Sequence, residues 1–361
     1  MKSSDSLVRS QPAIIVDGHE DIAFNALQGR DFLKSALEKR VVEGVNVQRA
    51  RGTATVGLPE LLRSGVRVVF ATIWVAPAEH AEFAGGATCY RTPEEAHEQA
   101  KGQLEYYVKL TANPLVRLVR TRSDLEFILA SKEPRIGLVL LMEGADPLIT
   151  PNEARSWFDA GVRIIAPAWH RTRYAGGTGD PGPLTPAGRE LMVQMKRAGV
   201  ALDVSHLAEE SFFEALELFD GPLLASHSNC RAYVPTDRQL SDEMIQALVK
   251  RNAVIGIVPY NKFLKPDWKR NESAKSEVTL SDVVRHMKHV WTIAGDTLHV
   301  AIGSDFDGGF GAESIPAELD TVADLQKIGS ALRSEQLPEA EVRNILSENW
   351  LSTLRRILPG A

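Results

Sequence analysis

The chain has 361 residues, of which 44% are hydrophobic and 24% charged, and its net charge is −6. This composition is that of an ordinary globular protein, and the negative charge offers no basic footprint for nucleic acid. Two cysteines exclude a disulfide framework and favour a reducing compartment. The polar tail 1–11 lacks a secretory signal, and no apolar run reaches the roughly 20 residues of a membrane span. We therefore expect a cytoplasmic protein that binds neither nucleic acid nor membrane.

Eight apolar runs with the character of β-strands follow one another along the chain. Most are continuous rather than alternating, which is typical of strands covered on both faces. Helical patterns separate them, such as the one that begins at Thr185-Pro186 and ends at Gly199. The runs are Ala13–Val16, Val66–Val75, Ile136–Met142, Val162–Ala166, Val200–Val204, Pro222–Ala225, Ala253–Val258 and Leu298–Ile302.

Alternating strands and helices predict parallel strand pairs joined by right-handed crossovers. Eight such units predict an α/β fold, a (β/α)₈ TIM-type barrel, as a single domain over 1–361 with a C-terminal helical extension at 334–358. Two polar stretches, Arg171–Leu184 and Asn261–Lys275, are expected as loops over the C-terminal mouth of the barrel. Barrel enzymes hold their active sites at that mouth.

Histidines and carboxylates stand at or just beyond the ends of the expected strands. One such residue alone is weak evidence, because most histidines at strand ends are ordinary polar residues. Their joint placement on one barrel face is informative, since this donor set suits divalent metals and zinc above all. In strand order the residues are His19, Asp21, Glu143, His170, His206, His227 and Asp305.

The spacing of these residues predicts two half-sites at the C-terminal ends of the strands. His19 and Asp21 are two positions apart, so that they point to the same side and can reach one ion. His206 and His227 end neighbouring strands and can hold a second ion, with Glu143 bridging the two. We expect two Zn²⁺ per chain, with other divalent metals possible.

Two metals a few ångströms apart lower the pKa of a bridging water and stabilise a tetrahedral intermediate. Asp305 is placed to orient that hydroxide and to carry its proton to a leaving amine. His170, at the fourth strand, is placed to donate a hydrogen bond to the oxyanion. The constellation thus predicts a binuclear hydrolase in which a metal-bridging hydroxide attacks an amide.

Other polar residues near these motifs receive supporting roles. Asp17 is expected to cap the local turn or to orient His19, and Asp203 to be structural or to support a ligand. Asp146 and Asp307 are expected as turn or helix-cap carboxylates. Cys230 lies close to His227 but is expected to be a buried structural thiol.

The motifs together resemble the membrane dipeptidase (renal dipeptidase) family of zinc peptidases, from Ile14 to about Ile357. The matching stretches are Asp17-Gly-His-Glu-Asp21, Glu143-Gly144, Gly161-Val-Arg, Leu184-Thr-Pro-Ala-Gly-Arg-Glu190, Leu202-Asp-Val-Ser-His206, Ala225-Ser-His-Ser-Asn-Cys-Arg-Ala232 and Gly303-Ser-Asp-Phe-Asp-Gly308. The resemblance implies a zinc dipeptidase that cleaves short peptides and tolerates a D-residue on the C-terminal side.

The same resemblance implies roles for individual residues. His19 with Asp21 would hold the first zinc and His206 with His227 the second, bridged by Glu143. His170 matches the histidine that contacts the substrate carbonyl, and Asp305 matches the active-site aspartate. Arg238 falls where the family keeps an arginine for the free carboxylate of the dipeptide, a task that suits its bidentate fork.

Two departures from the family pattern concern the substrate. Glu20 stands between the first two ligands, where the family usually has asparagine, and a carboxylate there could shift the charge of the pocket and its substrate preference. Arg171 and Arg173 follow His170 in place of an asparagine-bearing sequence, and could meet an acidic substrate group. The alternatives left open are a binuclear amidohydrolase acting on a lactam or another cyclic or non-peptide amide, and a barrel that only binds ligands. A homodimer is the expected oligomer on base rates.

Overall fold

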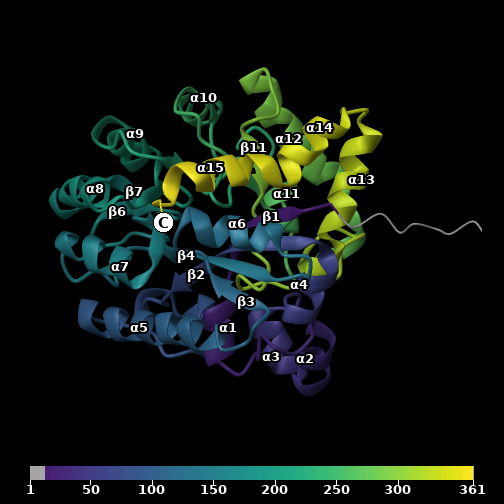
Figure 1. The fold of residues 1–361 in the computed structure, drawn as a ribbon, viewed down its shortest axis with the longest axis horizontal. Coiled ribbons are helices and arrows are strands. Elements are labelled where there is room, and N and C mark those ends of the chain that lie inside the picture. Colours follow the sequence, from purple (N-terminus) through teal and green to yellow (C-terminus); the bar gives the residue numbers. More distant parts are fainter. Residues whose placement is uncertain (1–12, 361) are drawn as a thin grey trace, which may run out of the picture.

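Parallel strands form a barrel inside a ring of helices in the computed structural model, which describes residues 13–360 (Figure 1). The expected tail 1–11 lies outside these residues. The strands pair in the order β10-β11-β1-β2-β4-β5-β8-β9, and a parallel bridge between Ala225 and Ile255 brings the two ends of the sheet together. The eight strands are β1 (Ile15–Glu20), β2 (Val66–Trp74), β4 (Ile136–Glu143), β5 (Val162–Ala166), β8 (Ala201–Asp203), β9 (Leu223–Leu224), β10 (Ile255–Ile257) and β11 (Val300–Ile302). The fold class expected from the sequence is confirmed.

Helices connect successive strands and cover the outside of the barrel (Figure 1). Four short helices follow β1: α1 (Ile22–Leu27), α2 (Ala36–Val42), α3 (Val45–Arg51) and α4 (Leu58–Ser64). The next crossover holds α5 (Pro93–Leu110), a short strand β3 (Val116–Leu118) and α6 (Arg122–Ala130). The remaining crossovers hold α7 (Ala154–Ala160), α8 (Pro186–Ala198), α9 (Glu209–Leu218), α10 (Asp242–Lys250), α11 (Asn261–Leu264) and α12 (Leu280–Ala294).

The C-terminal extension covers the end of the barrel opposite the mouth. It contains α14 (Glu339–Arg343) and α15 (Asn349–Ile357), preceded by α13 (Gln326–Ser334). Figure 1 shows α15 lying across the barrel in the middle of the ring of helices. Trp350 is fully buried among the inward-facing side chains and donates a hydrogen bond from Nε1 to the carbonyl of Ile302, 2.8 Å away. The extension is therefore part of the barrel core.

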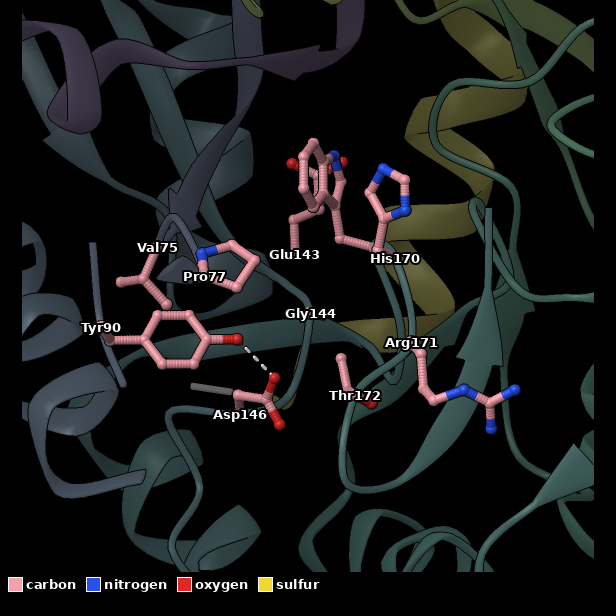
Figure 2. A pocket seen from close by; sticks show the side chains of 10 residues that line it. Val75, Pro77, Tyr90, Glu143, Gly144, Asp146, His170, Arg171 and Thr172 are labelled. Atoms are coloured by element: carbon pink, nitrogen blue, oxygen red, sulfur yellow. Dashed lines mark hydrogen bonds between the residues drawn. The ribbon is translucent and has the colours of Figure 1, made fainter. Parts of the chain in front are cut away.

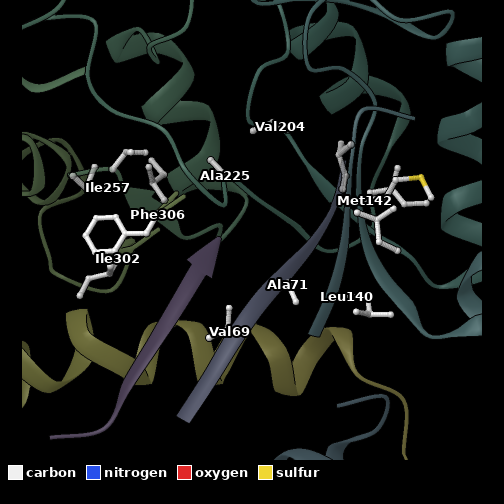
Figure 3. Packing of buried hydrophobic residues seen from close by; sticks show 14 of the residues in the cluster. Val69, Ala71, Leu140, Met142, Val204, Ala225, Ile257, Ile302 and Phe306 are labelled. Carbon is white, nitrogen blue, oxygen red and sulfur yellow. The ribbon is translucent and has the colours of Figure 1, made fainter. Parts of the chain in front are cut away.

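Two layers of apolar side chains follow from the alternation along the strands. Inward-facing residues such as Phe70 and Leu141 pack against α15, whereas outward-facing residues pack against the surrounding helices. Figure 3 shows part of the outer layer, with Val69, Ala71 and Leu140 along neighbouring strands. Since both faces of each strand are covered, the runs in the sequence are continuously apolar.

Three segments differ from their expected conformations. The stretch Asn261–Lys275, expected as a loop, begins with the short helix α11. The stretch Arg171–Leu184 contains an antiparallel hairpin, β6 (Ala175–Gly177) with β7 (Asp180–Leu184), rather than an irregular loop. β1 extends four residues beyond the expected strand end at Val16, through Asp17-Gly-His-Glu20. Among the described residues, no helix is long and apolar enough to cross a bilayer.

Candidate metal centre

A β-bulge in β1 sets the position of the first ligand-type residues. Asp17 pairs with Val69 and Glu20 pairs with Ala71, so Gly18 and His19 together oppose the single residue between Val69 and Ala71. A bulge of this kind re-aims side chains and is common beside active sites. Here it places His19 in the barrel mouth, where its ring contacts that of His227 with centroids 3.7 Å apart.

The carboxylate of Glu143 lies at the centre of the site. Its Oε1 is 3.1 Å from Nε2 of His206 and 3.2 Å from Nε2 of His227. Its Oε2 is 3.6 Å from Nε2 of His19 on the other side. Glu143 therefore joins two groups of potential ligands, one on each of its oxygens.

Potential ligand atoms form three overlapping groups, within each of which every atom lies within 4.8 Å of the others. The groups are His19 with Asp21 and Glu143, then Glu143 with His206 and His227, and finally His19 with His227 and Asp305. The structure thus brings together all five metal ligands expected from the sequence, with Asp305 beside them. His206 and Asp305 adopt positive φ values of 69° and 57°, in the left-handed region that few non-glycine residues occupy.

The electrostatics of the site are those of a cation site. Burial opposes ionisation of Glu143, yet the histidines around it hold its pKa well below the usual range. Burial also opposes charging of His19, but the Glu143 carboxylate outweighs it and raises the pKa of His19 to about 9. Burial and the Glu143 charge raise the pKa of Asp21 to about 6. Burial likewise raises the pKa of Asp305 well above its usual range. Crowded carboxylates of this kind need a positive partner to ionise together.

The donor set fits divalent metal ions. Nε2 of His19 is buried and has no hydrogen-bond partner among the described residues, although a buried polar atom normally has one. Nε2 of His206 and Nε2 of His227 lie only 3.0 Å apart. Burial lowers the pKa of His206 to about 4, so its imidazole is neutral at physiological pH, which is the ligand form. Three imidazoles and two carboxylates are donors typical of zinc.

Hydroxyl and carboxylate groups behind the ligands hold them in place. Oγ of Ser226 lies 2.7 Å from Nδ1 of His227 and 3.3 Å from Nδ1 of His19, and it donates to Asp203. Oδ1 of Asp17 accepts the backbone N–H groups of His19 and Ser304. The supporting roles expected for Asp17 and Asp203 agree with these contacts. Sequence reasoning gave Ser226 no role, although it sits directly before His227.

Thr72 is a second supporting residue that the sequence reasoning missed. Its hydroxyl donates to Oδ1 of Asp21 from the inner face of β2. The strand from Val66 to Trp74 is apolar except for Arg67 near its start and Thr72. The polar Thr72 was therefore the available signal in the sequence. An inward polar residue near a strand end needs a hydrogen-bond partner, and the partner here is a potential ligand.

His170 lies outside the strand where it was expected. β5 ends at Ala166, and Pro167 follows; proline cannot donate to the ladder, so His170 falls in the connection to β6. His170 and Glu143 both line the small pocket drawn in Figure 2. The ring stacks on that of His80, with centroids 3.9 Å apart and planes inclined by 24°. Burial lowers the pKa of His170, so the ring is a neutral donor.

Arg238 is buried beside the second group of ligands. Its Nη2 donates to the carbonyl of His227 over 2.6 Å, and its Nη1 donates to Oγ of Ser228 over 3.2 Å. Its Nε has no hydrogen-bond partner among the described residues. A buried guanidinium with a spare donor is unlike the solvated loop arginine that its position in the sequence alone would suggest.

Glu20, Arg171 and Arg173, the residues that depart from the family pattern, lie in different surroundings. Glu20 is fully buried on the outer face of β1, next to Asp17, and its effect on the substrate pocket stays a prediction. The bulge turns His19 inward and leaves Glu20 facing the surrounding helices. Arg171 and Arg173 line a cavity of about 540 Å³ next to the site. Each has a carboxylate partner, Asp180 at 2.9 Å and Asp146 at 3.6 Å respectively.

The family model for membrane dipeptidases, peptidase family M19, matches residues 5–358. The chain belongs to this family. A protein of Klebsiella pneumoniae, described as an uncharacterized protein in the pqqA 5′ region, is 31% identical over 265 residues, 71% of this chain and 94% of its own length. An uncharacterized dipeptidase of Schizosaccharomyces pombe is 26% identical over 207 residues, which are 56% of this chain and 48% of the yeast protein.

Solved structures of similar proteins match this chain over nearly its whole length. A metallopeptidase from Rhodobacter sphaeroides, solved with a phosphinate mimic of the dipeptide L-Ala-D-Ala, is 25% identical with a TM-score of 0.80. The match covers 96% of this chain and 99% of that one. An M19 metallopeptidase described as dipeptidase AC is 26% identical with a TM-score of 0.79, over 97% and 100% of the two chains. The family and the metallo-dipeptidase class predicted from the sequence are confirmed.

Proposed function

We propose that this M19 protein is a binuclear zinc dipeptidase that hydrolyses the peptide bond of dipeptides, including L,D-dipeptides. The observation that carries the proposal is the position of Glu143, with one oxygen toward His19 and the other toward His206 and His227. A carboxylate between two groups of imidazole and carboxylate donors suits a pair of ions better than a single one. His19 and Asp21 would hold one zinc, and His206 and His227 the other.

Zinc ions bound there would supply Lewis-acid polarisation and would lower the pKa of water toward neutrality. The side chains around the site then have separate tasks. Asp305 lies beside the ligands, with Oδ1 3.9 Å from Nε2 of His19, and would take up the proton of the attacking water on its carboxylate and pass it to the leaving amine. His170 would donate a hydrogen bond to the oxygen of the scissile carbonyl.

Arg238 would bind the free carboxylate of the dipeptide. Its buried Nε remains available, while Nη1 and Nη2 are held by Ser228 and by the carbonyl of His227. Such anchoring keeps the guanidinium in one orientation, so little side-chain entropy is lost when a carboxylate binds. Recognition of a carboxylate one residue beyond the scissile bond restricts the substrate to dipeptides.

The proposal that the enzyme accepts a D-residue on the C-terminal side is supported by the Rhodobacter sphaeroides metallopeptidase, whose structure contains a mimic of L-Ala-D-Ala. The experiment that tests the proposal measures kcat/KM of the zinc-loaded protein on L-Ala-L-Ala, L-Ala-D-Ala, their carboxyl-amidated forms and a set of lactams. Hydrolysis of the two dipeptides well above the amides is expected. Faster turnover of lactams than of dipeptides would identify a cyclic amidohydrolase instead.

A further inference from the structure

The three histidines proposed as ligands have hydroxyl groups next to Nδ1, but these hydroxyls come from different parts of the fold. Nδ1 of His19 and Nδ1 of His227 both lie near Oγ of Ser226, a residue at the end of a barrel strand. Nδ1 of His206 instead lies 3.0 Å from Oγ1 of Thr178, at the tip of the β6–β7 hairpin. The orientation of His206 therefore depends on a segment inserted outside the barrel.

The backbone of His206 also depends on this hairpin. Its φ of 69° lies in the left-handed region, which costs an L-residue on the order of 1–2 kcal/mol. The next two residues are held by the hairpin: Leu207 forms an antiparallel bridge with Gly177, and the N–H of Ala208 donates to the carbonyl of Gly176 over 3.1 Å. These contacts fix the unfavourable turn that points the imidazole at Glu143.

The hairpin is anchored on both sides of its tip. The N–H of Thr178 donates to the carbonyl of Trp169 over 3.1 Å, and the N–H of Gly179 donates to Oδ2 of Asp237 over 2.7 Å. Gly179 has a φ of 74°, and a Cβ atom there would come within 3.1 Å of the ring of His170. Thr178 is thus held at a fixed place between His170 and the segment that carries Arg238.

We propose that Thr178 is a positioning residue that fixes the ring orientation and the tautomer of His206 for metal binding. With Nε2 directed at Glu143 and His227, Nδ1 carries the hydrogen and donates it to Oγ1 of Thr178. A hydrogen bond of this kind keeps Nε2 unprotonated and makes the imidazole a better ligand. The inference rests on the proposed function, because it takes His206 to be a metal ligand.

Zinc affinity tests the inference without relying on turnover. Thr178→Val keeps the shape of the side chain and removes the hydroxyl, whereas Thr178→Ser keeps the hydroxyl. Competition titration with a chromophoric chelator should show one zinc of the Val variant bound about 10- to 100-fold more weakly, in line with the loss of an outer hydrogen-bond partner. The Ser variant should bind zinc within about threefold of the parent protein.

Thr185→Val is the matched control for general damage to the hairpin. Thr185 caps α8 directly after β7, and its Oγ1 also donates to the carbonyl of Arg173, but it does not contact His206. Loss of this cap should lower the free energy of unfolding by about 1 kcal/mol and leave zinc affinity unchanged. Zinc affinity lost equally in both Val variants would show that the hairpin acts only as a scaffold, and would overturn the role of Thr178.

The outcomes separate this inference from the proposed function. Parent-like zinc affinity in Thr178→Val, in a protein that hydrolyses dipeptides, would overturn the positioning role alone. Weakened zinc binding in Thr178→Val, in a protein whose parent hydrolyses no dipeptide, would uphold the positioning role and overturn the proposed function.

Discussion

Glu20 and Asp17 lie side by side on the outer face of β1, directly behind the metal centre, and both carboxyl groups are fully buried. Burial, together with the neighbouring Asp17 and Asp307 charges, raises the pKa of Glu20 well above its usual range. Oδ1 of Asp17 is already occupied by two backbone N–H groups, from His19 and Ser304. Burial raises the pKa of Asp17 as well, but these N–H groups favour its ionised form, so Glu20 is the group that holds a proton.

Glu20→Gln should stabilise the protein, and increasingly so as the pH rises. The folded parent keeps a proton on Glu20 that the unfolded chain releases above about pH 4.5, the ordinary value, so its free energy of unfolding falls as the pH increases beyond that point. Glutamine supplies a donor that does not titrate. Urea unfolding at pH 5 and pH 8 measures the effect, and a stability difference between the two proteins that is the same at both pH values would contradict it.

Binding of zinc should release protons near neutral pH. His19, with a pKa raised to about 9, carries a proton at pH 7 in the metal-free protein, whereas His206, with a pKa of about 4, carries none. A metal must displace the proton of His19, so zinc affinity should increase with pH up to about 9. Calorimetric titrations at pH 7 in two buffers of different ionisation enthalpy should differ by the heat of about one proton or more. Identical heats would show that His19 is not titrated by the metal.

Asp305→Asn should lower kcat by about 10²- to 10⁴-fold, the range for loss of a general acid–base group. Zinc content should stay close to that of the parent, because the five proposed ligands remain. Steady-state kinetics on L-Ala-D-Ala and metal analysis of the same sample measure the two effects. A variant that has lost one zinc would make Asp305 a ligand rather than a proton carrier.

Arg238→Ala should raise KM for dipeptides with a free carboxylate by about 10- to 100-fold, as expected for loss of a hydrogen bond between charged groups. Carboxyl-amidated dipeptides, which lack the negative charge, should be affected much less. Comparing KM for both substrate types in the parent and the variant measures the difference. An equal increase for both types would place Arg238 outside the carboxylate site.

The barrel, and the meeting of the candidate ligands at its mouth, could be predicted from the sequence because both depend on local patterns. Each strand is buried on both faces and reads as an apolar run, and parallel strands end at one mouth, so residues beyond the runs had to meet there. His206 and His227 follow neighbouring strands and meet with Nε2 atoms 3.0 Å apart. Such an encounter is fixed by topology and needs no knowledge of the loops.

Features that depend on contacts between distant segments could not be predicted. The bulge at Gly18 and His19 depends on the register between β1 and β2. Because nothing in the sequence indicates this bulge, Glu20 was expected to belong to the pocket. The hairpin β6–β7 contains glycines and two prolines that favour loops, yet pairing of its strands and contacts with Leu207 and Ala208 order it. Thr178 gave no signal of its own, since only the fold brings it to His206.

Anomalous diffraction from zinc-loaded crystals, recorded on both sides of the zinc absorption edge, tests the central claim most directly. The account predicts two anomalous peaks in each chain, one between His19 and Asp21 and the other between His206 and His227, with Glu143 bridging them. A single peak, or a second peak away from Glu143, would contradict the binuclear site.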